Sequence, residues 1–279
     1  MKTLIIKDSF TAQKASYERF AELQNTIETC DDNDLALYLH MENRVGYSFI
    51  FLFTTLPYLA EKYDKRIKIF CNNKNYNLFK KLRFLDEGVG FAPDFDYTHA
   101  LKKKAGLITE DAHIFRTVTV IPNEAPVKMS PDLASIFISR AGEMYNNALE
   151  HSKGNVLGAK YFRNQKNTYC FSCYDDGIGI PCNVMSLKKD LTSQVDAFRW
   201  AMIDGNSTVN DGIPRGLGLG LLKSFVRANE GSIRISSGNV LYTYKKNDTE
   251  KYYALKNRFH GTLFEMDIIA DNDRKYILT

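Results

Sequence analysis

Asp175-Asp-Gly-Ile-Gly-Ile-Pro181 is the stretch that decides how the carboxy-terminal half of the chain is interpreted. It follows Asn167 to Tyr174, whose composition and alternation predict a strand. Gly177 and Gly179 allow unusual backbone angles and a close approach of the backbone just beyond a carboxylate. We therefore expect a turn that contacts a ligand, with Asp175 fixed at the end of the strand.

A carboxylate held at a strand end can distinguish one purine from another. It accepts a hydrogen bond from the exocyclic amine of adenine, whereas guanine presents a carbonyl at the same place. The position of Asp175 suits this role.

A second glycine-rich block, Gly216-Leu-Gly-Leu-Gly-Leu221, leads into an apolar stretch from Leu222 to Ala228 that predicts a helix. Free backbone amides at a helix start attract phosphate. The block is not a P-loop, because leucine rather than glycine precedes Lys223. It is not a dinucleotide fingerprint either, because no predicted strand precedes it.

Upstream of both blocks, a predicted helix carries a polar stripe. Ser130 is its expected cap, Pro131 lies in its first turn, and it should extend to about His151. Glu143, Asn147 and His151 recur every four residues and therefore share one side of this helix. Taken alone, the stripe fits a solvated helix edge equally well.

The three blocks together, in this order and on a helix, a strand end and a helix start, resemble the GHKL ATPases. This superfamily contains gyrase, the heat-shock chaperone, histidine kinases and MutL. The resemblance covers about residues 115 to 272. It implies a GHKL-type (Bergerat) α/β sandwich that binds ATP together with Mg²⁺.

The resemblance also implies a role for each matching residue. Asn147 would be the magnesium ligand, and Glu143 the carboxylate that orients or activates the attacking water. Asp175 would read adenine with support from Thr262 through water, and His151 would stack on adenine or remain a cation at the helix end. The glycines would line the nucleotide and its phosphates: Gly177, Gly179, Gly216, Gly218 and Gly220.

Two further expectations concern the same nucleotide. A single asparagine, completed by phosphate oxygens and water, is the incomplete protein shell that magnesium tolerates. The stretch from Val184 to Arg215 would form a lid over the nucleotide, with a helix from Ser193 to Ile203. Lids of this kind gate catalysis.

The first ninety residues predict a small separate α/β domain, so that the expected fold class is α/β (α+β) with two domains. A linker over residues 91–114 would join residues 1–90 to an ATP-binding domain over 115–279.

The amino-terminal part is similar to STAS domains, with their order of strand, strand, helix, strand, helix. The similarity implies phosphorylation near Ser48, although a simple N-cap serine is the favoured interpretation. The expected strands are Thr3–Ile6, Leu35–Leu39 and Ile67–Cys71, and the expected helices are Ala12–Cys30, Ser48–Tyr63 and Tyr76–Leu82.

Composition narrows the functional class. The 279 residues carry a formal net charge of +4 with scattered basic residues, so no nucleic-acid surface is expected. Five cysteines and the absence of a hydrophobic signal region favour a reduced, cytoplasmic protein. The longest apolar stretch, Phe49 to Leu59, is far short of the ~20 residues that cross a bilayer. No membrane partner is expected.

The sequence leaves three activities open. We expect a regulatory ATPase, because Glu143 supplies the base that hydrolysis needs. A serine/threonine protein kinase of the anti-sigma-factor type shares that carboxylate, and a switch that binds nucleotide without turnover does not need it. A regulatory protein partner is expected in each case, and pairing into a homodimer is left open.

Overall fold

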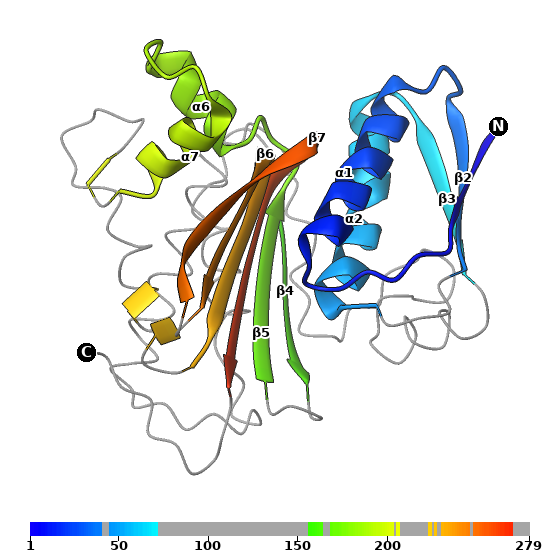
Figure 1. Ribbon diagram of the computed structural model, residues 1–279. Helices are drawn as coiled ribbons and strands as arrows, with labels where there is room; N and C mark the ends of the chain where they lie inside the picture. Colours follow the sequence, from blue (N-terminus) through cyan, green and yellow to red (C-terminus); the bar gives the residue numbers. More distant parts are fainter. Residues whose placement is uncertain are drawn as a thin grey trace, which may run out of the picture. The chain divides into compact units, whose positions relative to one another are not determined.

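The computed structural model describes residues 1–40, 45–71, 156–163, 168–203, 205–206, 223–224, 226–227, 230–245 and 248–269 (Figure 1). Within these residues, helices are mixed with strands that form two small sheets, which makes the fold α+β. The chain divides into two compact units, Met1–Tyr97 with Leu255–Phe259, and Thr98–Ala254 with His260–Thr279. The predicted strand 115–121, the helices 76–82 and 131–151 and the linker 91–114 lie outside the described residues. Within the described part, no helix is long and apolar enough to span a membrane.

The first unit is built on three parallel strands in the order β1-β2-β3, joined by two helices. Both helices lie on one face of this sheet (Figure 1). Each predicted strand and helix up to residue 71 is confirmed within a few residues. The order is strand, helix, strand, helix, strand, and it departs from the order on which the STAS similarity rests. The elements are β1 (Lys2–Ile6), α1 (Lys14–Thr29), β2 (Asp34–Leu39), α2 (Tyr47–Lys62) and β3 (Arg66–Cys71).

An aromatic cluster joins α1 to α2 in the interior of this unit. The rings of Phe10 and Phe49 lie 5.1 Å apart, and those of Phe20 and Phe53 lie 5.7 Å apart. Tyr17 packs 5.0 Å from Phe49. All five side chains are fully buried, and burial of each contributes about 1.5–3 kcal/mol. Aromatic side chains from both helices therefore form the core between them.

The start of α2 differs from the prediction. Gly46 is the N-cap residue, with no side-chain hydrogen bond to the first turn, and Ser48 lies inside the helix. Ser48 is only 8% exposed. The predicted capping role of Ser48 is therefore wrong, because the helix begins at Tyr47, one residue before it.

A buried lysine caps the carboxy-terminal end of α1. The ammonium of Lys65 donates to the carbonyl oxygens of Ile27 at 2.6 Å, Glu28 at 2.7 Å and Cys30 at 2.5 Å. These groups belong to the last turn of α1, whose free carbonyls carry partial negative charge. Lys65, the residue before β3, thus ties the start of β3 to the end of α1.

The residues that the structure describes in the second unit form a four-stranded sheet in the order β4-β5-β7-β6. β5 pairs antiparallel with β4 on one side and with β7 on the other. β5 confirms the predicted strand 167–174, whereas β4, β6 and β7 were not predicted. The strands are β4 (Val156–Arg163), β5 (Thr168–Asp175), β6 (Ser232–Lys245) and β7 (Asp248–Ile269), of which residues Leu255–Phe259 are grouped with the first unit.

Two short helices follow β5, and both contact β6 and each other. α7 (Gln194–Ala201) confirms the predicted helix 193–203, and Ser193 is its N-cap, accepting a hydrogen bond from the Asp196 N–H at 3.4 Å. α6 (Ile180–Leu187) was not predicted, because its first residues belong to the glycine-rich turn. Further along, the described residues at 223–224 and 226–227 are helical, as the apolar stretch predicts.

Candidate functional site

Asp175 is the last residue of β5, and its carboxylate is held in the interior. Its side chain is 5% exposed, and that of Asp176 is 2% exposed. The N–H of Gly177 donates to Asp175 Oδ1 at 2.9 Å. A short turn therefore closes on the carboxylate and fixes its orientation, as the strand-end position predicted.

Thr262 lies directly opposite Asp175 in the antiparallel ladder between β5 and β7. Side chains at directly opposed positions point to the same face of a sheet and lie about 4.5–5.5 Å apart at Cβ. The structure thus places side by side Asp175 and Thr262, which the family resemblance assigned to the same adenine site.

Gly261 permits the close approach of β7 to the end of β5. Its φ angle is +79°, which a residue with a side chain rarely adopts. A Cβ atom there would overlap the carbonyl oxygen of Asp175. In addition, the Tyr174 hydroxyl donates to the His260 carbonyl at 3.1 Å. Contacts between β5 and β7 therefore fix the backbone beside the Asp175 carboxylate.

Gly179 turns the chain from the aspartates into α6. It is the N-cap residue of that helix, with a φ angle of +85°. A Cβ atom at Gly179 would lie 3.0 Å from the Ser237 hydroxyl and 3.4 Å from the Gly261 carbonyl oxygen. The glycine is needed because β6, β7 and the first turn of α6 converge on this point.

Ser237, on β6, is a site residue that the sequence did not indicate. It is fully buried, and its hydroxyl oxygen accepts a hydrogen bond from the Ile180 N–H at 2.8 Å. The same oxygen lies 2.9 Å from Thr262 Oγ1 and 3.2 Å from the Gly261 carbonyl oxygen. Ser237 therefore links α6 to the residues that face Asp175.

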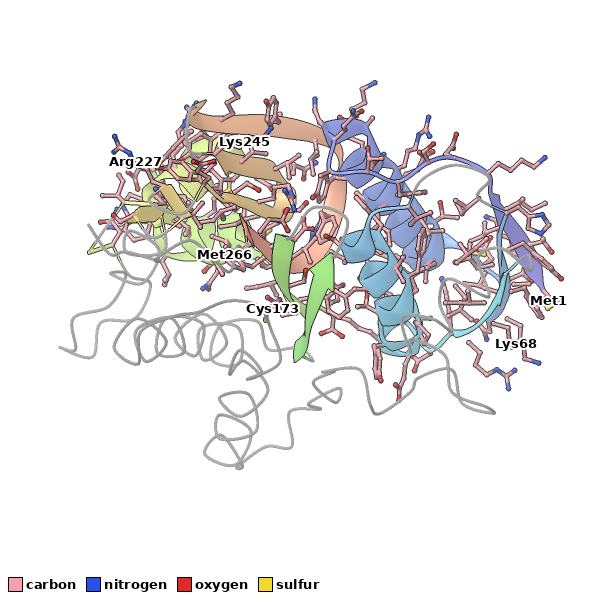
Figure 2. All side chains as sticks on the ribbon, turned by 90° about the horizontal axis from the view of Figure 1, so that it is seen from below. Met1, Lys68, Cys173, Arg227, Lys245 and Met266 are labelled. Carbon is pink, nitrogen blue, oxygen red and sulfur yellow. The ribbon has the colours of Figure 1, made fainter. Side chains whose placement is uncertain are left out.

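The charge of Asp175 acts on the thiol of Cys173. Cys173, labelled on β5 in Figure 2, is buried two residues before Asp175 and so shares its face of the sheet. Burial, and then the negative charge of Asp175, raises the pKa of the Cys173 thiol well above its ordinary range. This thiol stays protonated at neutral pH.

A second polar cluster lies within the same unit. Lys223 Nζ donates to Glu250 Oε1 at 2.6 Å, and the Tyr252 hydroxyl donates to Glu250 Oε2 at 2.8 Å. Burial alone would raise the pKa of Glu250, but the hydrogen bonds from Lys223 and Tyr252 and the charge of Lys223 together lower it. The cluster joins the helical residues after the second glycine block to β7.

The remaining predicted site residues lie outside the described residues: Glu143, Asn147, His151, Gly216, Gly218 and Gly220. The structure therefore brings together Asp175, Gly177, Gly179 and Thr262, and adds Ser237 and Gly261 to them. In the ranges that the structure describes, no three His, Cys, Asp or Glu side chains gather in a way that could hold a metal ion.

Comparison of the chain with protein-family models finds no match, and a search of curated proteins finds none either. The site is therefore interpreted from its own geometry and from the pattern of its residues.

Proposed function

We propose that this chain is a Mg²⁺-dependent ATP-binding protein of the GHKL type that acts as a regulatory ATPase. The observation that carries the proposal is the buried carboxylate of Asp175 at the end of β5. It faces Thr262 across the ladder and is closed by the turn at Gly177.

The chemistry of this arrangement favours adenine. A carboxylate is an acceptor only and offers about four lone-pair sites. Asp175 can therefore accept from an exocyclic amine while it keeps the bond from the Gly177 N–H. A buried hydrogen bond to a charged group is stronger than the same bond in water, and a carbonyl in place of the amine would be repelled.

The finer architecture of the proposal is a Bergerat sandwich in the second unit. It is supported by the sheet β4-β5-β7-β6 with α6 and α7 packed against β6, and by the order of the three sequence blocks. The magnesium ligand Asn147, the base Glu143 and the phosphate loop Gly216–Gly220 are proposed from the sequence pattern.

Two alternatives use the same nucleotide site. One is a serine/threonine protein kinase of the anti-sigma-factor type, in which Glu143 serves phosphoryl transfer to a protein. The other is a switch that binds a regulatory partner according to the nucleotide it holds, without turnover. Release of phosphate separates hydrolysis from both.

Calorimetric titration of ATP with and without Mg²⁺ tests the proposal. Asp175→Asn keeps an oxygen for the Gly177 N–H but removes the charge, and should weaken ATP binding about 10- to 100-fold, the value of one charged hydrogen bond. Asp176→Asn is the matched control, because Asp176 is equally buried in the same turn. It should leave ATP binding nearly unchanged.

Phosphate release is then measured on the wild type and on Glu143→Ala. Release that Glu143→Ala abolishes establishes the ATPase, and binding without release favours the two alternatives. The proposal is overturned if the folded wild-type chain does not bind ATP, or if the two aspartate variants bind it equally well.

A further inference from the structure

The Ser237 hydroxyl lies among three groups, each within hydrogen-bond distance of its oxygen. These are the Ile180 N–H at 2.8 Å, Thr262 Oγ1 at 2.9 Å and the Gly261 carbonyl oxygen at 3.2 Å. Ser237 itself is fully buried, so its hydroxyl depends on these protein groups for its hydrogen bonds.

Counting donors assigns the proton of each hydroxyl. A serine hydroxyl has one proton to donate and two lone pairs to accept with. The Ile180 N–H can only donate, and the Gly261 carbonyl can only accept. All three contacts become hydrogen bonds at once only if Ser237 donates to Gly261 and Thr262 donates to Ser237.

The reverse arrangement makes one bond fewer. If Ser237 donated to Thr262, it would have no proton left for the Gly261 carbonyl. Buried polar groups are almost always hydrogen-bonded, because leaving one unsatisfied is unfavourable. The arrangement with three bonds is therefore the stable one, and in it the Thr262 proton points at Ser237 while the Thr262 lone pairs remain for a ligand.

We propose that Ser237 is a positioning residue that fixes the Thr262 hydroxyl as an acceptor, so that Thr262 and Asp175 together select a base carrying an amine and reject one carrying a carbonyl. This inference rests on the proposed nucleotide site. Asp175 cannot donate when ionised. A free Thr262 hydroxyl could turn and donate to a carbonyl, and the bond to Ser237 removes that option.

ATP and ITP are suitable probes, because hypoxanthine carries an oxygen where adenine carries its amine. Binding of both is measured by titration for the wild type and for Ser237→Ala, in which the Thr262 proton is released. The preference for ATP over ITP should fall about fivefold, the equivalent of one net hydrogen bond. The same Ser237→Ala change in a Thr262→Val background should leave the preference unchanged, because no hydroxyl remains to turn.

A purely structural role for Ser237 predicts a different result. Loss of the bond to the Ile180 N–H would lower the melting temperature in both backgrounds and weaken ATP and ITP equally. An unchanged preference in Ser237→Ala therefore overturns the inference while ATP binding stands, and a wild type that does not bind ATP overturns the proposed function with it. If Ser237→Ala does not fold, Ser237→Cys keeps a weaker donor and acceptor, so its preference for ATP over ITP must fall below that of the wild type, and an unchanged preference overturns the inference.

Discussion

Gly261→Ala is expected to be among the most damaging single-methyl additions in the second unit. The new Cβ would occupy the position of the Asp175 carbonyl oxygen, and it would lie 2.9 Å from the Asp176 Cα. These are backbone atoms, so no side-chain rotation can relieve the overlap. The end of β5 and the turn after it would have to move away from β7.

The magnitude follows from two contributions. A left-handed backbone angle for alanine costs about 1–2 kcal/mol, and forcing an extra carbon into a packed position costs about 1–3 kcal/mol. The free energy of unfolding should therefore fall by about 2–5 kcal/mol. Gly205→Ala is the matched control, since Gly205 has a similar φ of +87° but nothing within 4 Å of its added Cβ. It should lose only the first contribution.

Urea unfolding of the wild type and the two variants, followed by circular dichroism, measures the difference. ATP titration on the same samples should show weaker binding in Gly261→Ala, because the Asp175 carboxylate moves with its backbone. If Gly261→Ala and Gly205→Ala lose the same stability, the close approach of β7 to β5 is not what requires the glycine, and the reasoning is refuted.

Three further expectations concern stability and pH. Lys65→Met should lower the free energy of unfolding by about 2–4 kcal/mol, because the α1 carbonyls lose a charged donor, whereas Lys68→Met on the exposed side of β3 should cost little in the same urea titration. Cys173 has a raised pKa in the folded state, so its stabilising contribution is complete below the unfolded value of about 8.5 and is lost as pH rises above it. Cys173→Ala should therefore flatten the decline of stability above that pH by up to about 1.4 kcal/mol per unit, and identical slopes would contradict the cause assigned to the shift. Glu250 has a lowered pKa, so its contribution to stability is present above about pH 4.3 and disappears as pH falls through the pKa of the folded state. Glu250→Gln should therefore reduce the free energy of unfolding at pH 7 by less than about 1 kcal/mol and have no effect at pH 2. Thermal melts at both pH values would show this difference.

Much of the first unit follows from local signals. Apolar runs bounded by polar turns predict β1, β2 and β3, and the longer stretches between them predict α1 and α2. The start of α2 was misjudged, because serine is a preferred cap but Gly46 adopts the extended angles that the position needs. The contact of Lys65 with α1 is set by tertiary packing, which no local pattern encodes.

In the second unit, local sequence patterns predict fewer of the helices and strands. α6 was missed because Gly177 and Gly179 indicate a turn, although Pro181 at its first turn is a helix-start signal that was available. Among the described strands, β4 lies at the edge of the sheet, and its sequence carries Lys160 and Arg163, which weaken its alternation. Edge strands often carry such charges.

The site was predictable only in part, for a physical reason. Asp175 and its glycines are adjacent in sequence, so their turn could be recognised. Ser237 joins them through the register of β6 against β7, two strands of unequal length, 14 and 22 residues. A shift of one residue would send Ser237 to the other face, and the sequence does not fix that register.

The pairing of β5 with β7 also has a consequence for how the chain is made. The Tyr174 hydroxyl and its acceptor at His260 are 86 residues apart, and Asp175 meets Thr262 through the same late pairing. Contacts of such long sequence separation form slowly, because closing the long loop between them costs entropy before the contact stabilises it. During synthesis, β5 leaves the ribosome well before β7 exists, so the arrangement of Asp175 with Thr262 can form only after β7 has emerged.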